Sequence, residues 1–561
     1  MKTNTIIEYG VVDVTAKKDS TLSANDIQSF SQLSNLKKDK LPEKKYSTFE
    51  KNFFILDGQC DNMQSTINDV GLWTSSMSDS QGDFTTPPVL TITFSQAHTS
   101  PGLTLTFSQY SYCNNLKIQY YDLNNTLLSE KTFAPDNYEY FCEDLVENYG
   151  KIVITFYSTN IPYRYLKLYK LMYGNAILFN NDDIASCNIL EQFNVISDEL
   201  SINTLEFIVF SEDDRFNILN PQGIYSTIQQ GQELKVYQEK NNILTNMGVY
   251  YIDKWESIGN NKMQFTAVDI VGLLDRYDFK GKMYDNGKVG TTVFSIMQQA
   301  GLLDLYTLET ALGQKSLVGY IPRCTCREAL QKVLFASGGV AKTSRNGILE
   351  LKQIALSESP IEISRSDIFK GSETIKKGDV YTAVLIKSHN YKADLTQQKT
   401  VYSNYLEPGT YTVEFDEPYY LFSCNGATKV SGTTYTYVTF RVDTAGNVTV
   451  AAYPYIDSTH DVLVVNSTLV GNEKENILYV ESLEIANDSN SADIGQRILD
   501  YYNNQYESEF EKVLEEENVA DNVLIQEPYG NELDGFITEL DIDLTRGYVT
   551  KCKTVAKVSG S

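Results

Sequence analysis

The sequence predicts a mainly β protein built from several domains. At 561 residues the chain is too long for one hydrophobic core, because domains usually hold ~100–200 residues. Its 39 Tyr and 25 Phe residues far exceed its 2 Trp residues, and aromatic and β-branched side chains favour strands. Short apolar runs that alternate with polar residues recur between turn signals, as in Leu90-Thr-Ile-Thr-Phe94. This alternation is typical of strands with one face in a core.

The first 50 residues are predicted as a strand followed by an arm. Residues 8–13 have the strand pattern, and residues 16–45 are polar and rich in Ser, Asp and Lys. Residues 51–175 then form a predicted β-sandwich, because alternating runs such as Leu103-Thr-Leu-Thr-Phe107 and Ile152-Val-Ile-Thr-Phe156 recur at regular spacing.

Residues 176–276 are predicted as a second β domain, a barrel, with runs such as Leu205-Glu-Phe-Ile-Val-Phe210. Residues 277–376 are predicted as a small α+β domain. Its two helices are expected at 292–300 and 326–336, where apolar residues recur at i, i+3 and i+4.

The last barrel is predicted from two separated segments, residues 377–399 and 483–561. Between them, residues 400–482 hold a dense set of strand patterns and are predicted as an inserted β-sandwich. A helix is expected over 491–516, opened by a Ser cap and carrying an apolar stripe.

One internal echo links the two barrel regions. The segments 235–238, 248–252 and 263–267 repeat in type and spacing as 523–526, 535–540 and 548–551. Both sets are predicted as a strand, a glycine-led strand and a further strand. This pattern indicates either a true duplication or the general likeness of β meanders.

Bulk charge and composition exclude several classes of protein. The net charge of −26 argues against binding duplex DNA through its phosphates, which requires clustered Lys and Arg. No apolar run approaches the ~20 residues needed to span a bilayer, and the N-terminus lacks a secretory pattern. The eight cysteines are scattered and are predicted to be reduced thiols of a protein made in a cytoplasm. Cys324-Thr-Cys326 has no second pair at metal spacing, so a buried strand pair is predicted there.

Catalytic and cofactor motifs are not found. The three histidines, His98, His389 and His460, stand in no Gly-x-Ser-x-Gly or His-Glu-x-x-His setting. Neighbouring acids such as Glu212 and Asp213 are expected by chance among 73 acidic residues, and they are predicted to be solvated. The sequence therefore predicts no enzyme, no cofactor and no metal site.

The C-terminal segments Asn522-Val-Leu-Ile-Gln-Glu-Pro-Tyr-Gly530 and Leu533-Asp-Gly-Phe-Ile-Thr-Glu-Leu540, with the closing Leu544-Thr-Arg-Gly547, resemble the ends of phage tail hub proteins. These are called baseplate hub proteins in contractile tails and tail-tip proteins in flexible ones. The start, Tyr9-Gly-Val-Val-Asp-Val-Thr-Ala16, is similar to the start of such proteins in phages of Gram-positive bacteria. The sandwich at 51–175 resembles discoidin-like, galactose-binding modules through Trp73-Thr-Ser-Ser-Met-Ser-Asp79 and its strands.

This resemblance implies two similar hub barrels in each subunit, so that three subunits present six barrels to a hexameric tail tube. The implied partners are further copies in a homotrimer, the tail tube protein, other baseplate or tip proteins and a tape-measure protein in the channel. The implied location is a virion or a phage-tail-like particle. The chain stops soon after its last predicted strand, which favours a contractile phage or a bacteriocin particle.

Two sets of candidate site residues follow. An aromatic surface for a host glycan is expected at Trp73, Tyr110, Tyr112 and Tyr120, since aromatic rings stack on sugars, although a lone Trp in a β module more often lies in the core. Acids lining a channel are expected at Asp213, Asp214, Glu532 and Asp534. A structural hub is the leading hypothesis, a glycan-binding adhesin the second, and a wall-degrading enzyme the third.

Overall fold

The computed structural model describes residues 3–12, 14–37, 46–53, 70–210, 230–240, 243–259, 261–354, 359–430, 435–469, 474–503, 506–526, 530–545 and 547–559. The fold is mainly β, as predicted. The chain divides into a sandwich unit, residues 8–178, and a main unit, residues 1–7 and 179–561. Strands β1 (Thr3–Val12) and β9 (Gly174–Phe179) contain the two points at which the chain passes from one unit to the other. None of the helices in the described ranges has the length and apolar character needed to cross a membrane.

The sandwich unit is built around two long antiparallel strands, β4 (Val89–Phe107) and β7 (Glu139–Thr159). Its sheet has the order β3-β8-β4-β7-β5-β6. The remaining strands are β3 (Leu72–Met77), β5 (Cys113–Tyr121), β6 (Leu127–Phe133) and β8 (Tyr165–Met172). Alternate residues of these strands are buried, which is the pattern that the sequence predicts.

The predicted arm is instead part of the sandwich unit. Strand β2 (Thr21–Ala24) pairs with β4, and helix α1 (Val14–Asp19) and the 3₁₀ helix η1 (Leu33–Lys37) flank it. Ala16 and Leu36 are fully buried in the sandwich core. Sequence patterns miss this because β2 is only four residues long and no residue in it is buried, so the polar residues dominate the segment.

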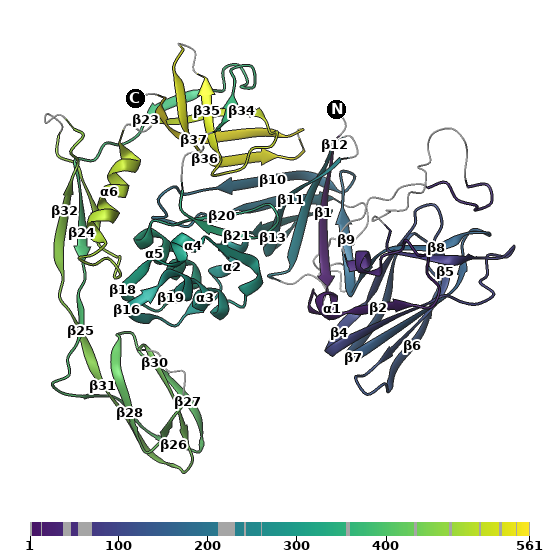
Figure 1. Ribbon diagram of the computed structural model, residues 1–561, viewed down its shortest axis with the longest axis horizontal. Helices are drawn as coiled ribbons and strands as arrows, with labels where there is room; N and C mark the ends of the chain where they lie inside the picture. The colour runs from purple at the N-terminus through teal and green to yellow at the C-terminus, as the bar shows by residue number, and fades with distance from the viewer. Residues whose placement is uncertain are drawn as a thin grey trace. The chain divides into compact units, whose positions relative to one another are not determined.

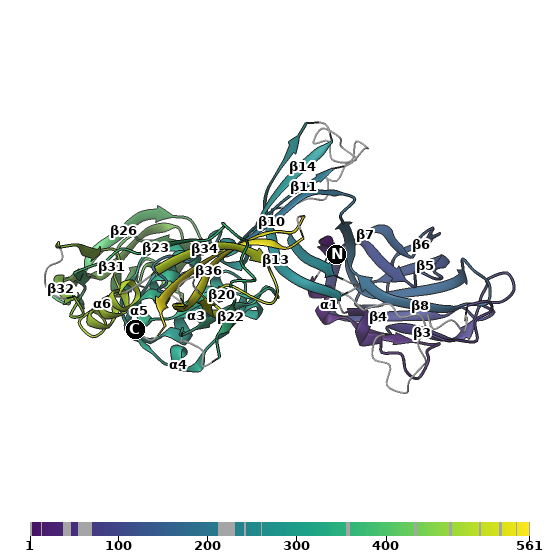
Figure 2. The ribbon, with the colours of Figure 1, turned by 90° about the horizontal axis from the view of Figure 1, so that it is seen from above.

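One continuous sheet runs through the main unit, in the order β23-β34-β37-β36-β10-β11-β14-β13-β12, with β35 pairing β36 and β22 pairing β35 (Figures 1 and 2). Its N-terminal strands are β10 (Ile184–Gln192), β11 (Thr204–Phe210), β12 (Glu233–Lys240), β13 (Ile243–Ile258) and β14 (Lys262–Val268). Its later strands are β22 (Ile361–Ile363), β23 (Thr374–Lys377), β34 (Tyr506–Val513), β35 (Asn522–Gln526), β36 (Glu532–Asp543) and β37 (Val549–Val558).

The α+β part packs four helices with short strands around one large core. The helices are α2 (Ile270–Leu274), α3 (Val289–Gln299), α4 (Thr310–Gly313) and α5 (Cys326–Ser337), and a 3₁₀ helix spans Leu303–Leu305. The strands pair as β15 (Asp278–Phe279) with β19 (Cys324–Thr325), β16 (Lys282–Lys288) with β18 (Ser316–Ile321), and β17 (Tyr306–Leu308) and β20 (Val340–Thr343) with β21 (Leu349–Lys352).

Helix α5 corrects the prediction that Cys324 and Cys326 share a buried strand. The side chain of Thr325 accepts a hydrogen bond from the Glu328 amide, and Glu328 accepts one from the Thr325 amide. This reciprocal capping box starts a helix at Cys326. Gly338 ends it in the left-handed conformation, at φ 70°. Cys326 is therefore a buried helix residue, and the seven described cysteines are free thiols.

The insert has its own small core, formed by Phe415, Phe422, Val438, Phe440, Val442, Val448, Val450 and Ala452. Strands β25 (Tyr391–Ala393), β26 (Lys399–Leu406) and β28 (Tyr419–Asn425) pair with β31 (Gly446–Asp457). Strands β27 (Gly409–Glu414) and β29 (Thr428–Lys429) pair with β30 (Tyr437–Val442).

Three predicted boundaries differ from the structure. Strand β24 (Ala383–Ser388), predicted in the last barrel, instead pairs with β32 (His460–Val465) and β33 (Ile477–Val480), which were predicted in the insert. Strands β22 and β23, predicted in the α+β domain, belong to the long sheet. Helix α6 spans only Ser491–Tyr502, because the alternation of buried and partly exposed residues from Tyr506 to Phe510 makes β34.

Candidate functional site

Two groups of five strands in the main unit have the same topology. The first strand unit contains β10 to β14, and its sheet order is β10-β11-β14-β13-β12. The second strand unit contains β23 and β34 to β37, and its sheet order is β23-β34-β37-β36, with β35 on the far side of β36. Numbered along the chain, both groups have the order 1-2-5-4-3. The echoed segments of the sequence occupy strands 3, 4 and 5 of each.

The two strand units also agree in their local irregularities. Strand 4 carries a bulge after Ile252 in the first unit and after Ile537 in the second. Before strand 3, the Gly231 amide donates to the Ile252 carbonyl at 2.7 Å, and the Ala520 amide donates to the Ile537 carbonyl at 2.8 Å. Gly231 and Ala520 both have positive φ, 84° and 65°. Ala520 adopts this conformation despite its Cβ, so the same local geometry recurs where the residue type does not favour it.

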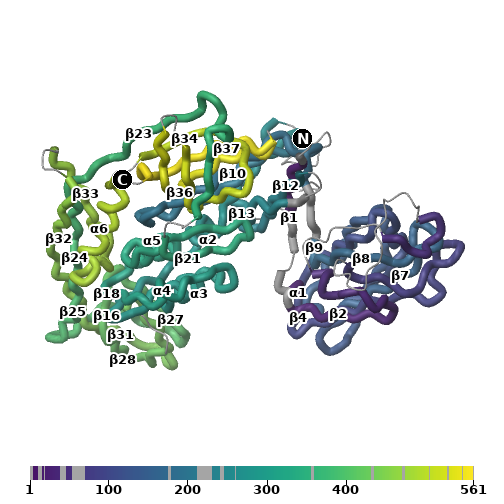
Figure 3. Tube along the Cα trace, turned by 45° about the horizontal axis from the view of Figure 1, so that its top comes forward, coloured from purple at the N-terminus to yellow at the C-terminus, as the bar shows by residue number. Residues whose placement is uncertain are grey.

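The two strand units are joined by an antiparallel pairing of β10 with β36 (Figure 3). Strand 1 of the first unit therefore lies beside strand 4 of the second. The Asn188 Nδ2 donates to Asp541 Oδ1 at 2.7 Å, and the Gln192 Nε2 donates to Glu539 Oε2 at 2.9 Å. On the opposite face of the same pairing, Ile189 is fully buried. The junction thus combines a buried apolar face with amide–carboxylate hydrogen bonds on its other face.

Arg345, whose side chain is 14% exposed, connects this junction to the α+β part. Its Nε and Nη2 donate to the two Glu191 carboxylate oxygens at 2.9 and 3.1 Å, and Nη2 also donates to the Glu517 carbonyl at 3.1 Å. Burial acts to lower the pKa of Arg345, but the charge and hydrogen bonds of Glu191, together with Tyr250 and Asp521, raise it on balance. Burial, with the nearby Glu191, raises the pKa of Tyr250 well above its usual value. One guanidinium therefore holds β10 and the loop after β34 together.

Asp269 makes a second link between the first strand unit and the α+β part. It caps helix α2 by accepting hydrogen bonds from the Val271 and Gly272 amides at 3.1 and 3.2 Å. Thr343 Oγ1 of β20 donates to its other oxygen at 2.7 Å. Full burial raises the pKa of Asp269 to about 6, although each of these hydrogen bonds acts to lower it.

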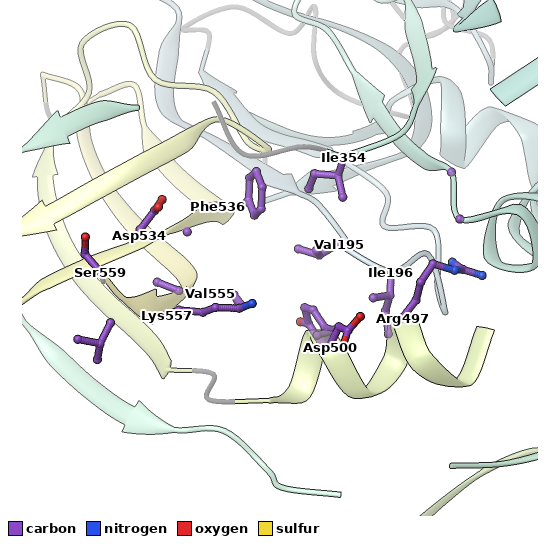
Figure 4. A pocket seen from close by; sticks show the side chains of 16 residues that line it. Val195, Ile196, Ile354, Arg497, Asp500, Asp534, Phe536, Val555, Lys557 and Ser559 are labelled. Carbon is purple, nitrogen blue, oxygen red and sulfur yellow. The ribbon is translucent and has the colours of Figure 1, made fainter. Parts of the chain in front are cut away.

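A pocket of about 530 Å³ lies between β36, β37 and α6 (Figure 4). Val195, Phe536 and Val555 supply apolar side chains, and Arg497, Asp500 and Lys557 stand among them. The Arg497 Nη2 donates to the Phe335 carbonyl at 2.7 Å, and burial lowers the pKa of this guanidinium. An apolar floor with charged residues around it is usual in protein interfaces.

The residues predicted to contact a glycan are mostly closed to solvent. Trp73 is 1% exposed and packs edge-on against Phe30, with ring centroids 5.3 Å apart. Tyr120 is fully buried. Neither ring can stack on a sugar, so this part of the prediction is wrong. Tyr112 is half-buried and donates to the Asp136 carbonyl, and Tyr110 is 36% exposed. The four rings do not form one surface, because the strand alternation turns Trp73 and Tyr120 into the sandwich unit.

The predicted channel acids are only partly described. Asp213 and Asp214 lie outside the described residues. Glu532 and Asp534 are two residues apart on β36, both half-buried. Asp534 accepts a hydrogen bond from Asn522 Nδ2 at 2.8 Å and lines the pocket of Figure 4.

Glu191 and Arg345 are not among the candidate residues that the sequence predicts. A signal for Glu191 was present, because Cys187, Ile189 and Glu191 occupy alternate positions of one strand and the first two are buried. A carboxylate at a core-facing position requires a buried partner. No local pattern identifies that partner, which lies 154 residues further along the chain.

Each histidine contacts an aspartate. His98 Nε2 lies 3.0 Å from Asp19, His389 Nδ1 lies 2.7 Å from Asp457, and His460 Nε2 lies 3.2 Å from Asp488. Within the described part of the chain, no group of three or more His, Cys, Asp or Glu side chains is placed to hold a metal ion.

No protein-family model matches the chain, and no curated protein matches it. Solved structures do match. The 43 kDa tail protein of prophage MuSo2 from Shewanella oneidensis is 12% identical, with a TM-score of 0.41, over 67% of this chain and 95% of that chain. The tail protein from Neisseria meningitidis MC58 is 11% identical, with a TM-score of 0.41, over 67% of this chain and 93% of that chain.

A smaller structure matches as well. It is the family 32 carbohydrate-binding module of NanJ from C. perfringens, in complex with galactose. It is 13% identical, with a TM-score of 0.19, over 31% of this chain and 99% of that chain.

Proposed function

We propose that this protein is a structural hub subunit of a phage tail or phage-tail-like particle, which joins the tail tube to the baseplate or tip. The observation that carries the proposal is the duplicated strand unit. Three copies of a chain with two similar units present six similar units around an axis, and a ring of this kind can match a sixfold tube. The sequence resemblance at the C-terminal strands supports the same role.

The hub is a homotrimer around a central channel. Its partners are the tail tube protein, other baseplate or tip proteins, and a tape-measure protein in the channel. The junction is suited to a load-bearing role, because the backbone pairing of β10 with β36 is supported by the buried Ile189 and by the ion pair between the buried Glu191 and Arg345. We propose no catalytic step for it.

The channel is lined by acidic residues. The net charge of −26 supports this proposal, because carboxylates repel phosphates over a Debye length of ~8 Å at physiological salt. Glu532 and Asp534 on β36 are the described candidates. A reconstruction of the ring maps this charge directly. A neutral or basic bore would contradict the acidic channel without affecting the hub assignment.

The sandwich unit acts as a spacer or a docking module for another tail protein. Burial of Trp73 and Tyr120 removes two of the four rings expected to contact a glycan.

The mass of the assembled protein tests the hub proposal. Native mass spectrometry of the purified particle's tail tip, and of the concentrated protein, is expected to find three copies. A reconstruction of the same particle is expected to show a threefold ring at the end of the tube. Six copies in one ring, or a location away from the tube axis, would contradict the proposal.

A further inference from the structure

Because the strand unit is duplicated, two further strand edges are equivalent to the two edges that form the internal junction. Within the chain, strand 1 of the first unit (β10) pairs with strand 4 of the second (β36). The reverse combination would pair strand 1 of the second unit, which is β23, with strand 4 of the first unit, which is β13. Among the described residues, β23 ends the sheet, and β13 pairs only with β14 over residues 254–258. Unpaired edges of this kind are templates for another strand.

We infer that β23 of one copy pairs antiparallel with residues 254–258 of β13 in a second copy, and so repeats the β10–β36 junction between subunits. This inference rests on the proposed function and names the surface through which the trimer forms.

The register of this pairing follows from the internal junction. The bulges align Ile258 with Asp543, Ser257 with Ile542, and Glu256 with Asp541. β23 is aligned with β10 through strands 2 and 5 of each unit. Glu509 of β34 occupies the position of Glu206 of β11, because the residues that lie opposite them, on β37 and β14 respectively, are equivalent positions of strand 5. Thr374 pairs with Glu509 and Asn188 pairs with Glu206. Thr374, Ile375 and Lys376 therefore correspond to Asn188, Ile189 and Leu190.

Transferring the internal pairs to these equivalent residues defines the contact between copies. Asn188 pairs with Asp543, Ile189 with Ile542, and Leu190 with Asp541. The expected pairs between copies are Thr374 with Ile258, Ile375 with Ser257, Lys376 with Glu256, and Lys377 with Trp255.

The exposure of these residues is consistent with a missing partner strand. Ile189 is 0% exposed in the internal junction, whereas its equivalent Ile375 is 42% exposed. Ile258, at the other edge, is 40% exposed. Both are large apolar side chains at strand edges, and in the inferred register Ile375 lies opposite Ser257 and Ile258 lies opposite Thr374, on the two faces of the pairing.

Charge distinguishes a second copy from an unrelated strand. β23 ends in Lys376 and Lys377, and the side chain of Lys376 is 74% exposed although it contacts Glu507 at 2.6 Å. The inferred register places Lys376 opposite Glu256 of β13, which is exposed. Opposite charges directly across a strand pair are favourable. One chain therefore carries both members of an opposite-charge pair, one on each edge, an arrangement that can close a ring head to tail.

Cysteine cross-linking tests the register in the full chain. Directly paired residues in antiparallel strands have Cα atoms about 4.5–5.5 Å apart, which is within the range of a disulfide. T374C/I258C is expected to give covalent dimers and trimers on a non-reducing gel after mild oxidation. N188C/D543C, the equivalent internal pair, is expected to close within one chain. T374C/E256C, two residues out of register, and the unsubstituted chain are expected to give little product.

A charge exchange tests the same contact without disulfides. K376E is expected to lower the fraction of trimer measured by native mass spectrometry, and K376E/E256K is expected to restore it. K352E, on β21 away from both edges, is the matched control and is expected to leave the trimer unchanged.

The outcomes separate this interface from the hub proposal. A trimer without T374C/I258C cross-links, and with no rescue by K376E/E256K, would overturn the interface and leave the hub intact. Absence of any ring of three copies in the particle would overturn both. Equal cross-linking of T374C/I258C and T374C/E256C would also overturn the interface, because it would show contact without a register.

Discussion

Replacing Arg345 by methionine is expected to destabilise the main unit strongly. The substitution keeps much of the apolar length of the side chain and removes the guanidinium, so Glu191 loses both of its donors at 2.9 and 3.1 Å. The side chain of Glu191 is 5% exposed and cannot be rehydrated without opening the strands. The Glu517 carbonyl loses a donor in the same step.

The magnitude follows from the burial of the pair. Removing one partner of a buried ion pair costs ~3–5 kcal/mol, because it leaves an uncompensated charge in the interior. Replacing both partners by apolar residues costs far less, and is often close to neutral. R345M is therefore expected to lower the free energy of unfolding by about 3–5 kcal/mol, and E191L/R345M is expected to recover most of that loss.

Fluorine NMR can show which of the two units loses stability in R345M. Trp73 and Trp255 are the two tryptophans of the chain, and they lie in the sandwich unit and the main unit respectively. Incorporation of 5-fluorotryptophan gives one resonance for each unit during urea unfolding. R345M is expected to shift the transition of the Trp255 resonance to lower urea and leave that of Trp73 unchanged. A loss under 1 kcal/mol, or a double variant no more stable than R345M, would refute a buried, coupled pair.

Two further predictions concern pH and the limits of the sandwich unit. The pKa of Asp269 is raised to about 6 from 3.8 in the folded state, so its contribution to stability is present below pH 3.8 and is lost as the pH rises through about 6. This shift corresponds to ~3 kcal/mol at 1.36 kcal/mol per pKa unit. In urea unfolding measured at a series of pH values, the main unit of the natural chain should therefore lose stability relative to D269N over that range. Parallel curves of stability against pH for the two proteins would contradict this. Residues 8–178 expressed alone are expected to melt cooperatively by circular dichroism. Residues 51–173 lack the buried Ala16 and Leu36, so this shorter fragment is expected to melt at a lower temperature or not to fold. Equal melting temperatures of the two fragments would show that the N-terminal segment is not part of this core.

The sequence by itself determined the elements that depend on neighbouring residues. Period-two alternation identified strands such as β4, β7 and β11, and i, i+3, i+4 spacing identified α3 and α5. The echo of three segments identified strands 3, 4 and 5 of both strand units, because each strand carries its own pattern of buried and exposed positions. The sequence placed Trp73 in a β-sandwich, but it left open whether its ring faces a glycan or the core.

Only the tertiary structure decided which strands pair and which side chains meet. The β10–β36 junction joins Asn188 to Asp541, 353 residues apart, and Arg345 reaches Glu191 and Glu517 from a turn between two short strands. β23 and β24 follow one another in the chain, yet β23 joins the long sheet and β24 joins β32 and β33. Strand pairing is non-local: the backbone hydrogen bonds of a strand are satisfied equally well by many partners. The choice among them depends on the packing of the whole core.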